Sequence, residues 1–355
     1  PVMRQLPLAD VHREDARTFS RAWSLDLPGS FEAGARREYA ALGETVGLLD
    51  ESYRGVIDFL GEDAGTFLDK VVSSPVPALD DRGGQDSCLL SAKGRLLGIF
   101  TLWRLSSAHF RAVLCEPPRD TLLEGLRKYA LLSDIEVRDV TAELSILALR
   151  GPLAAAVLEA VGAAASPGVF EVSPFQSGGV SLDCAGVSRP GGYELWTSST
   201  ELSGLWARLQ GLVEDADGLP VGWEASETKR IEAAIAAFGR DYDDDFFPAE
   251  VDEDHRLNYE KCYVGQEVVA RMRTYGHANR KLFHLFSSTD TGLSEGSKVY
   301  CDSLEAGRVG TTCHSFAHSR PLALAMIQRK FFNSNSLHLE GGAPVEIVEL
   351  PGRGE

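Results

Sequence analysis

The sequence lacks several features that would place it in a common class. No apolar run in its 355 residues approaches the roughly 20 residues that a membrane-spanning helix needs. The first thirty residues alternate charged residues, prolines and short apolar pieces, which is not the pattern of a secretory signal. We therefore expect a cytoplasmic protein with no membrane partner. The chain begins at Pro1 without a methionine, so a removed leader stays an open alternative.

Cysteine is scarce and dispersed. The six cysteines form no CxxC pair and stand at positions 88, 115, 184, 262, 301 and 313. In a chain of this length they indicate reduced thiols in a cytosol-like compartment. They provide no framework for a zinc ion or a complete iron–sulfur cluster within one chain, so we expect no metal site. The sequence also contains no HExxH motif, phosphate loop or nucleophile elbow.

Positive charge is in short supply. The formal net charge is −17, from 35 basic and 52 acidic residues, which argues against binding nucleic acid or an anionic membrane. Residues 268–289 are a local exception, because they contain no Asp or Glu. This basic island contains Arg271, Arg273, His277, Arg280, Lys281 and His284. Either it binds an anionic ligand, or it is a chance cluster on a solvated surface.

Hydrophobic periodicity predicts a chain of mixed helices and strands. Alternating patterns predict strands over 56–60, 88–91, 95–105, 109–115, 135–140, 144–149, 180–187 and 193–197. Helical spacing predicts helices over 62–72, 120–132, 153–161, 202–213 and 225–236, with Asp120 as an N-cap. From residue 282 onward, short strands separated by Gly and Ser predict a small β-barrel. We expect a core domain over 1–281, made of two subdomains that divide near 150–180, and a barrel domain over 282–355.

Residues 261–267 read Lys-Cys-Tyr-Val-Gly-Gln-Glu and hold the most chemically loaded cysteine. Good helix formers follow Gly265, which predicts a turn into a helix at that glycine. Cys262 would then lie within one turn of a helix N-terminus. Unpaired N–H groups and the helix dipole favour a thiolate there, as does the neighbouring ammonium of Lys261. The alternative is a buried structural cysteine.

Four segments together resemble a known family. They are residues 46–50, 91–95, 192–195 and 230–235. As a set they resemble the folate-binding core of the glycine-cleavage T-protein, a tetrahydrofolate-dependent aminomethyltransferase. The resemblance covers roughly residues 40–350. It implies an α+β fold of mixed sheets and helices with a C-terminal small β-barrel, and tetrahydrofolate or a C1-substituted folate as the cofactor.

The same resemblance implies folate contacts. Glu194 matches the family's pterin-binding glutamate and Arg230 its folate-contacting arginine, while Arg189 and Tyr193 are further candidates. A carboxylate suits the pterin edge because it accepts a pair of hydrogen bonds from adjacent donors. An aromatic ring suits the flat pterin face. Without the resemblance, Glu194 would be an exposed strand acid and Arg230 a cation on a helix surface.

The cysteine segment resembles a different branch. Residues 261–267 and 268–271 are similar to the signature of the YgfZ branch, folate-binding proteins that support iron–sulfur cluster assembly or repair. This implies Cys262 as the functional thiol, Lys261 beside it, and an iron–sulfur protein as a partner. The other motif residues are Tyr263, Gly265, Gln266, Glu267 and Arg271. The branch usually has Lys-Gly-Cys-Tyr, whereas this chain has Glu260 and Lys261 before the cysteine.

One departure from the T-protein decides between the two functions. T-protein enzymes carry an Asp on the strand after the turn at 91–95, and this chain has Gly98 and Ile99 there. The sequence therefore favours a YgfZ-like protein that supports iron–sulfur cluster assembly or repair. The alternative is a folate-dependent aminomethyl or C1 transferase whose acid comes from the Asp-rich loop 241–245. A third possibility is a purely structural or binding module.

Overall fold

The computed structural model describes residues 5–188, 191–276, 278–287 and 293–350. Contacts within the chain divide it into two compact units. The first unit comprises Pro1–Ser87 and Ile99–Ser226, and the second comprises Cys88–Gly98 and Glu227–Glu355. The domain boundary expected between residues 281 and 282 stays a prediction. None of the described helices combines the length and apolar character needed to cross a bilayer.

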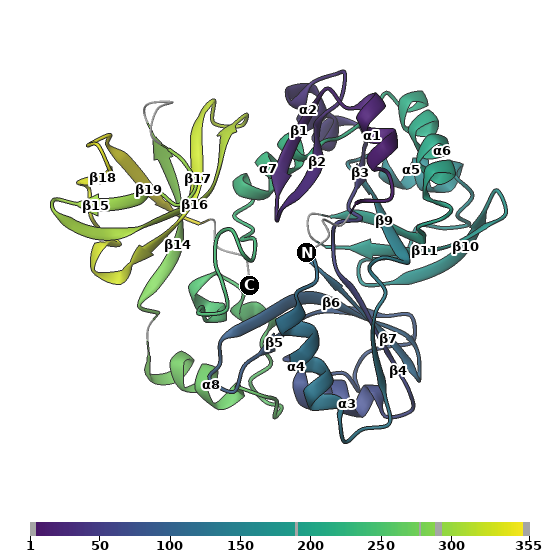
Figure 1. Cartoon of the computed structure of the whole chain (residues 1–355), viewed down its shortest axis with the longest axis horizontal. Helices are drawn as coiled ribbons and strands as arrows, with labels where there is room; N and C mark the ends of the chain where they lie inside the picture. Colours follow the sequence, from purple (N-terminus) through teal and green to yellow (C-terminus); the bar gives the residue numbers. More distant parts are fainter. Residues whose placement is uncertain (1–4, 189–190, 277, 288–292, 351–355) are drawn as a thin grey trace. The chain divides into compact units, whose positions relative to one another are not determined.

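The first unit contains two sheets and most of the helices (Figure 1). Its helices are α1 (Ala9–Asp15), α2 (Ala35–Glu44), α3 (Ala64–Val71), α4 (Asp120–Ala130), α5 (Ala154–Ala160) and α6 (Leu202–Asp215). A five-stranded sheet has the order β5 (Gly84–Leu90), β6 (Leu96–Ser106), β7 (His109–Leu114), β4 (Val56–Leu60) and β8 (Glu136–Asp139). A six-stranded sheet has the order β10 (Val172–Ser177), β11 (Val180–Val187), β12 (Gly192–Ser198), β9 (Leu144–Arg150), β3 (Gly47–Asp50) and β13 (Leu219–Pro220). A separate hairpin joins β1 (Thr18–Ala22) to β2 (Leu25–Ser30).

The two large sheets of this unit share an apolar core. Trp103 of β6 meets Trp196 of β12 edge to face, with 5.4 Å between ring centroids, and Ile146 of β9 packs in the same cluster. On the opposite face of the six-stranded sheet, Leu147 of β9 packs with Leu158 of α5. Successive strand residues point to opposite faces, so β9 contributes to both cores.

The second unit is built on a six-stranded antiparallel sheet that curls into a half-barrel (Figure 1). Its strand order is β18 (Leu337–Leu339), β15 (Lys298–Cys301), β16 (Leu304–Ser315), β17 (Arg320–Gln328), β14 (Arg280–Ser287) and β19 (Val345–Glu349). Helix α7 (Trp223–Glu232) enters this unit, and α8 (Gln266–Tyr275) precedes β14. Short 3₁₀ turns cover Pro248–Glu250, Asp254–Arg256 and Arg329–Phe331. The predicted α+β class with a curled C-terminal β-module is confirmed.

Three local predictions are wrong. Asp120 is the first residue of α4 rather than its N-cap, which is Arg119. The helix expected over 225–236 ends at Glu232, because Ala234 adopts a left-handed conformation with φ of 57°. No strand or helix is predicted within 163–179, yet this stretch contains β10, because Pro174 interrupts the alternation of that strand. The remaining predicted elements are present with small shifts at their ends.

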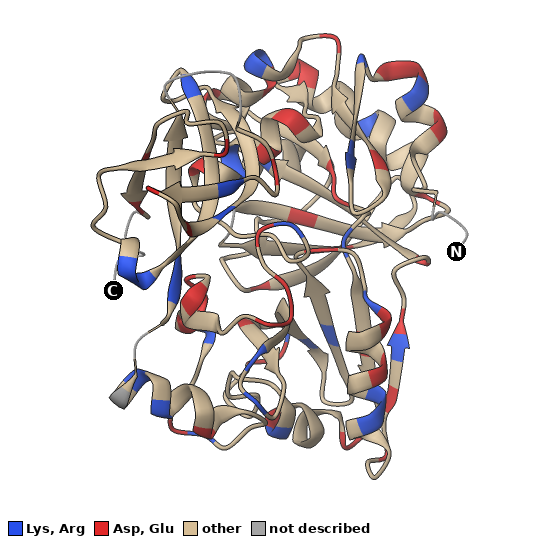
Figure 2. Cartoon of the chain, turned by 60° about the vertical axis from the view of Figure 1, so that its left-hand side comes forward, with Lys and Arg blue, Asp and Glu red and all other residues tan. Residues whose placement is uncertain are grey.

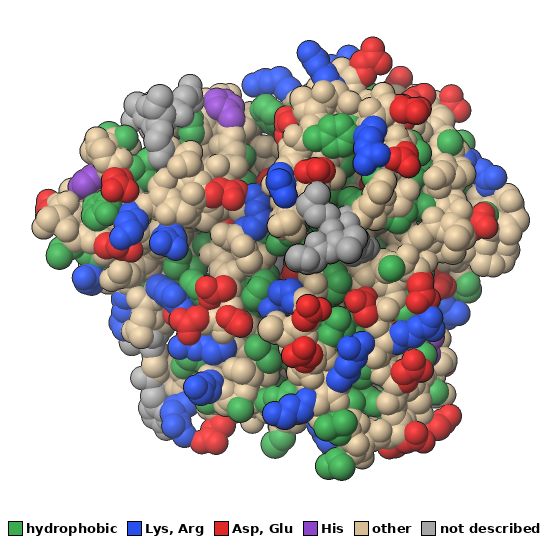
Figure 3. All heavy atoms as spheres, viewed as in Figure 1, with side chains coloured by type: hydrophobic (Ala, Val, Ile, Leu, Met, Phe, Trp, Pro, Cys, Tyr) green, Lys and Arg blue, Asp and Glu red, His purple; other side chains and the backbone are tan. Residues whose placement is uncertain are grey.

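Charged residues are mixed along both units. Acidic and basic residues are interspersed along the ribbon in Figure 2, and the face in Figure 3 shows both kinds. The acidic excess of the composition is therefore spread over the chain.

Candidate functional site

A buried charge cluster in the first unit surrounds Glu194. This residue lies on β12, and its side chain is only 2% exposed. One carboxylate oxygen, Oε1, accepts a hydrogen bond from Nη1 of Arg54 at 2.6 Å. The other, Oε2, accepts one from Nε1 of Trp196 at 3.2 Å. Nη2 of Arg150 lies 3.6 Å from Oε1. Glu194 is therefore an inward-facing carboxylate held between two arginines.

Glu51 balances the charge of this cluster. Nη1 of Arg54 also donates to Glu51 at 2.7 Å, and Nη2 of Arg150 donates to both Glu51 oxygens at 3.2 Å. Burial alone would raise the pKa of Glu51, but Arg150 and Arg54 outweigh it and hold that pKa below the ordinary value. The carboxylates likewise raise the pKa of Arg54 against the effect of its burial. The cluster thus pairs two carboxylates with two guanidinium groups.

Sequence reasoning missed the three other charged residues of the cluster around Glu194. Glu51 and Arg54 directly follow the apolar strand β3, and Arg150 is the last residue of the apolar strand β9. The sequence signal that could have revealed them is a charged residue at or just after the end of a buried strand. None of the three residues lies in a recognisable motif, so the sequence did not single them out.

The other folate candidates of the first unit do not join Glu194. Tyr193 precedes it on β12 and packs with the core on the opposite face of the sheet. Arg189 lies outside the described residues. Their roles as folate contacts stay predictions.

Arg230 lies in the second unit, on α7, and every N–H of its guanidinium is engaged. Nε and Nη2 donate to Glu227 at 2.7 and 2.8 Å. Nη1 donates to Asp241 at 2.9 Å and to the carbonyl of Ile235, and Nη2 also donates to Thr311 at 2.6 Å. Glu227 and Asp241 raise the pKa of Arg230 although burial opposes them. A folate contact by Arg230 stays a prediction, and it would require one of these partners to be exchanged.

Both carboxylate oxygens of Asp241, the first acid of the loop 241–245, also accept hydrogen bonds. Its Oδ1 accepts from the backbone N–H and the hydroxyl of Thr311, at 2.7 and 2.8 Å. Its Oδ2 accepts from Arg230 and from the backbone N–H of Ala237 at 2.8 Å. Asp243, Asp244 and Asp245 are exposed. Asp241 is therefore a structural anchor rather than a proton donor.

The segment 261–267 adopts the predicted turn. Gly265 is the N-cap of α8, with φ of 83°, and Cys262 lies exposed just ahead of it. The alternative of a buried structural cysteine is wrong. The ammonium of Lys261 lies 5.8 Å from the centroid of the Tyr263 ring. In the described ranges, no group of three or more His, Cys, Asp or Glu is arranged to hold a metal ion.

Within the second unit, the segment 91–95 contacts the segment 261–267 at Gly265. A Cβ atom added there would lie 2.4 Å from the carbonyl oxygen of Ser91, and one added at Gly94 would lie 3.1 Å from Val268. The tip of the β5–β6 hairpin therefore packs against the start of α8. Tyr263, next to this contact, is buried, and burial raises its pKa. Gln266 donates to the Tyr259 carbonyl at 3.0 Å, so it fixes the same turn.

Two arginines of the basic island are paired with acids. Arg271 pairs with Glu267 at 2.6 Å, and Arg280 pairs with Glu250 at 3.1 Å. Arg273 instead lies over the ring of Tyr259, 4.3 Å from its centroid. Among the described residues, none places a carboxylate within ion-pair distance of Arg273. His277 lies outside the described residues.

Comparisons with known proteins cover nearly the whole chain. An aminomethyltransferase of Bacillus licheniformis is 26% identical over 340 residues, which is 93% of this chain and 92% of the relative. An aminomethyltransferase of Staphylococcus carnosus is 24% identical over 343 residues, with the same shares. The crystal structure of glycine cleavage system aminomethyltransferase T from Bartonella henselae has the same fold. It matches with a TM-score of 0.86 and 21% identity over 98% of both chains.

These relatives overturn the leading functional prediction. A role in iron–sulfur cluster assembly or repair, with Cys262 as its thiol, is wrong because the relatives that cover 93% of this chain are aminomethyltransferases. The iron–sulfur protein expected as a partner is not supported. The prediction gave too much weight to one heptapeptide and one missing acid, and the YgfZ branch is not confirmed. The family profile described as the GCVT N-terminal domain matches residues 8–261. The chain therefore belongs to the family defined by the GCVT N-terminal domain.

Proposed function

We propose that this chain is a folate-dependent aminomethyltransferase that transfers a one-carbon unit between an amine and tetrahydrofolate. The observation that carries the proposal is the span of the similarity, which reaches 93% of this chain and 92% of a named aminomethyltransferase. Both the core sheets and the C-terminal half-barrel are included in that span.

The cluster around Glu194 supports folate as the cofactor. A pterin presents adjacent N–H donors, and a buried carboxylate can accept them in a pair. Each oxygen of Glu194 accepts one hydrogen bond, and a carboxylate oxygen has a second lone pair. Arg54 can remain paired with Glu51 while Glu194 turns to a ligand, because Nη1 already donates to both acids. The residues present therefore fit a pterin without leaving a buried charge unpaired.

Each residue has a separate task in this proposal. Tetrahydrofolate, when bound, supplies the nitrogens that receive the one-carbon unit. Glu194 holds and orients the pterin edge, and Arg54 and Arg150 hold that carboxylate in place. Arg230 positions the segment from Ile235 to Asp241 rather than contacting the reacting atoms.

Proton handling differs from that of the T-protein. Gly98 and Ile99 replace the acid expected on β6, and Asp241 is bound on both oxygens. We propose that the exposed residues of the same loop, Asp243 to Asp245, are the remaining supply of a carboxylic acid. The six cysteines are free thiols, which agrees with a reducing compartment, and we propose the cytoplasm as the location.

The test is a direct assay of the transferred carbon. The protein is incubated with tetrahydrofolate and candidate amines, and methylene- or methyl-tetrahydrofolate is detected by mass spectrometry. Glu194→Gln should weaken tetrahydrofolate binding about tenfold or more, because it removes a charged acceptor. Glu159→Gln, an exposed glutamate on α5, is the matched control and should bind normally. No product with any amine, together with no heat-stabilisation by tetrahydrofolate, would contradict the proposal.

A further inference from the structure

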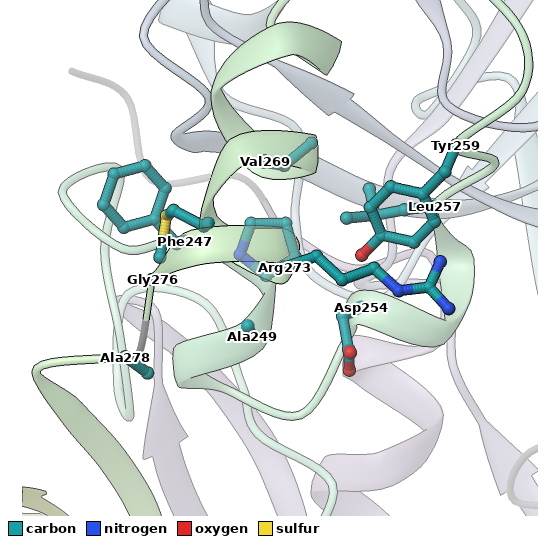
Figure 4. A pocket seen from close by; sticks show the side chains of 11 residues that line it. Phe247, Ala249, Asp254, Leu257, Tyr259, Val269, Arg273, Gly276 and Ala278 are labelled. Carbon is teal, nitrogen blue, oxygen red and sulfur yellow. The ribbon is translucent and has the colours of Figure 1, made fainter.

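The second unit contains a small pocket. None of the residues proposed above as folate contacts lines it. It has a volume of about 180 Å³ and lies between α8 and the chain from Phe247 to Tyr259 (Figure 4). Its apolar walls include Phe247, Leu257, Val269 and Met272. Leu257 and Val269 are buried, so these walls are fixed by the packing of the unit.

The polar groups gather at one end of this pocket. Figure 4 shows the carboxylate of Asp254, the hydroxyl of Tyr259 and the guanidinium of Arg273 near one another, with Phe247 at the other end. Arg273 lies 4.3 Å from the centroid of the Tyr259 ring, which holds it over the pocket. Burial raises the pKa of the Tyr259 hydroxyl, with Asp254 adding to the effect and Arg273 opposing it. The charges of Asp254 and Arg273 therefore both act on the Tyr259 hydroxyl, at one end of the pocket.

Both charged groups are available to a ligand. Arg273 and Asp254 are exposed at the rim, and no ion-pair partner of either lies among the described residues. Their neighbours differ in this respect, since Arg271 and Arg280 each have an acid within 3.1 Å. An unpaired cation and an unpaired anion at the mouth of one apolar pocket favour a ligand that carries both charges. A ligand with only a negative charge would be repelled by Asp254, and a ligand with only a positive charge would be repelled by Arg273.

The volume limits the size of that ligand. It equals roughly six liquid-water molecules and is smaller than the roughly 300–1,000 Å³ of pockets for drug-sized ligands. We propose that this pocket binds a free amino acid with an apolar side chain. Arg273 binds its carboxylate, Asp254 binds its ammonium group, and the side chain lies against Phe247 and Val269. The inference is independent of the proposed folate chemistry.

The test uses the full chain and L-valine, L-leucine and L-methionine as probes, with binding measured by ligand-observed NMR titration. Saturable binding of at least one is expected. For the amino acid that binds, the two analogues that lack either the ammonium or the carboxylate should bind roughly tenfold more weakly. For leucine these are 4-methylpentanoate and isoamylamine. No saturable binding of any of the three, or analogues that bind as tightly as the amino acid, would overturn the inference.

Variants locate the site. Arg273→Gln and Asp254→Asn should each weaken binding about tenfold, a modest factor because both groups are at the rim. Arg271→Gln is the matched control, because Arg271 is on the same helix, pairs with Glu267 and does not line the pocket. Equal weakening by Arg271→Gln would overturn the assignment. Tetrahydrofolate binding by Arg273→Gln should be unchanged, which separates this site from the Glu194 cluster.

Discussion

Nη1 of Arg54 lies 2.6 Å from Oε1 of Glu194, and both side chains are shielded from water. The exposed fractions are 11% for the arginine and 2% for the glutamate. A charge in such surroundings depends on its partner, because water cannot replace the lost interaction. The same atom of Arg54 also serves Glu51, so one side chain stabilises two buried carboxylates.

Replacing Arg54 by methionine should therefore destabilise the first unit. Arg150 alone cannot compensate two acids, so we expect a loss of about 3–5 kcal/mol in the free energy of unfolding. Chemical denaturation followed by circular dichroism measures it. Arg138→Met, at an exposed ion pair on β8, is the control and should leave the midpoint unchanged. A similar small effect in both variants would show that the cluster is not a buried charge network.

Gly265→Ala should destabilise the second unit. The left-handed conformation costs a residue with a Cβ about 1–2 kcal/mol, and the Ser91 carbonyl oxygen stands 2.4 Å from the new atom. Gly211→Ala, in α6, is the opposite control, since no atom lies within 4 Å of its added Cβ. That control should gain roughly 0.5–1 kcal/mol, because alanine favours a helix interior over glycine. Denaturation midpoints of the two variants should move in opposite directions.

Arg230→Lys should be a severe change although it keeps the charge. Lysine has three donors at one point and cannot reproduce the fork that reaches Glu227, Asp241 and Thr311 together. We expect a loss of about 2–4 kcal/mol in unfolding free energy. Arg308→Lys, exposed on β16 of the same unit, should have no measurable effect. If Arg230→Lys lost folate binding but kept full stability, a ligand-contacting role would replace the positioning role.

Mild acid should weaken the second unit through His284. Burial lowers the pKa of this histidine below its ordinary value of 6.5, and its Nε2 donates to the carbonyl of Ile231 at 2.8 Å. A histidine with a lowered folded pKa contributes stability above the unfolded pKa, and this contribution is lost as the pH falls below about 6.5 toward the folded pKa. Unfolding midpoints between about pH 8 and pH 5.5 should fall in the native chain. His284→Gln, which keeps a donor for Ile231, should flatten that fall.

Local sequence patterns predicted most of the elements. Strands such as Val180–Val187 and helices such as Leu202–Asp215 have the periodicity of one buried face, which depends only on neighbouring residues. The turn at Gly265 was predictable from the glycine itself and the helix formers that follow it. Elements whose pattern is broken were missed, as with β10 and its Pro174.

The candidate site depended on contacts that the sequence does not encode locally. Glu194 meets Arg54 across 140 positions, and Arg230 meets Thr311 across 81. No periodicity reveals such pairs. The family resemblance singled out Glu194 and Arg230, but their partners became known only from the fold. The wrong prediction of an iron–sulfur role also came from local sequence, because the segment 261–267 was given more weight than similarity along the whole chain.

The contact of Ser91 with Gly265 has a consequence for how the protein is made. About 170 residues separate the hairpin tip from the helix that covers it, so this contact must wait for a very long loop to close. On the ribosome, the chain through Ser226 emerges before α8 exists, and the tip at 91–95 then lacks its cover. We expect the second unit to acquire protease resistance last during synthesis, and a chain stopped before residue 265 to be cut at that tip.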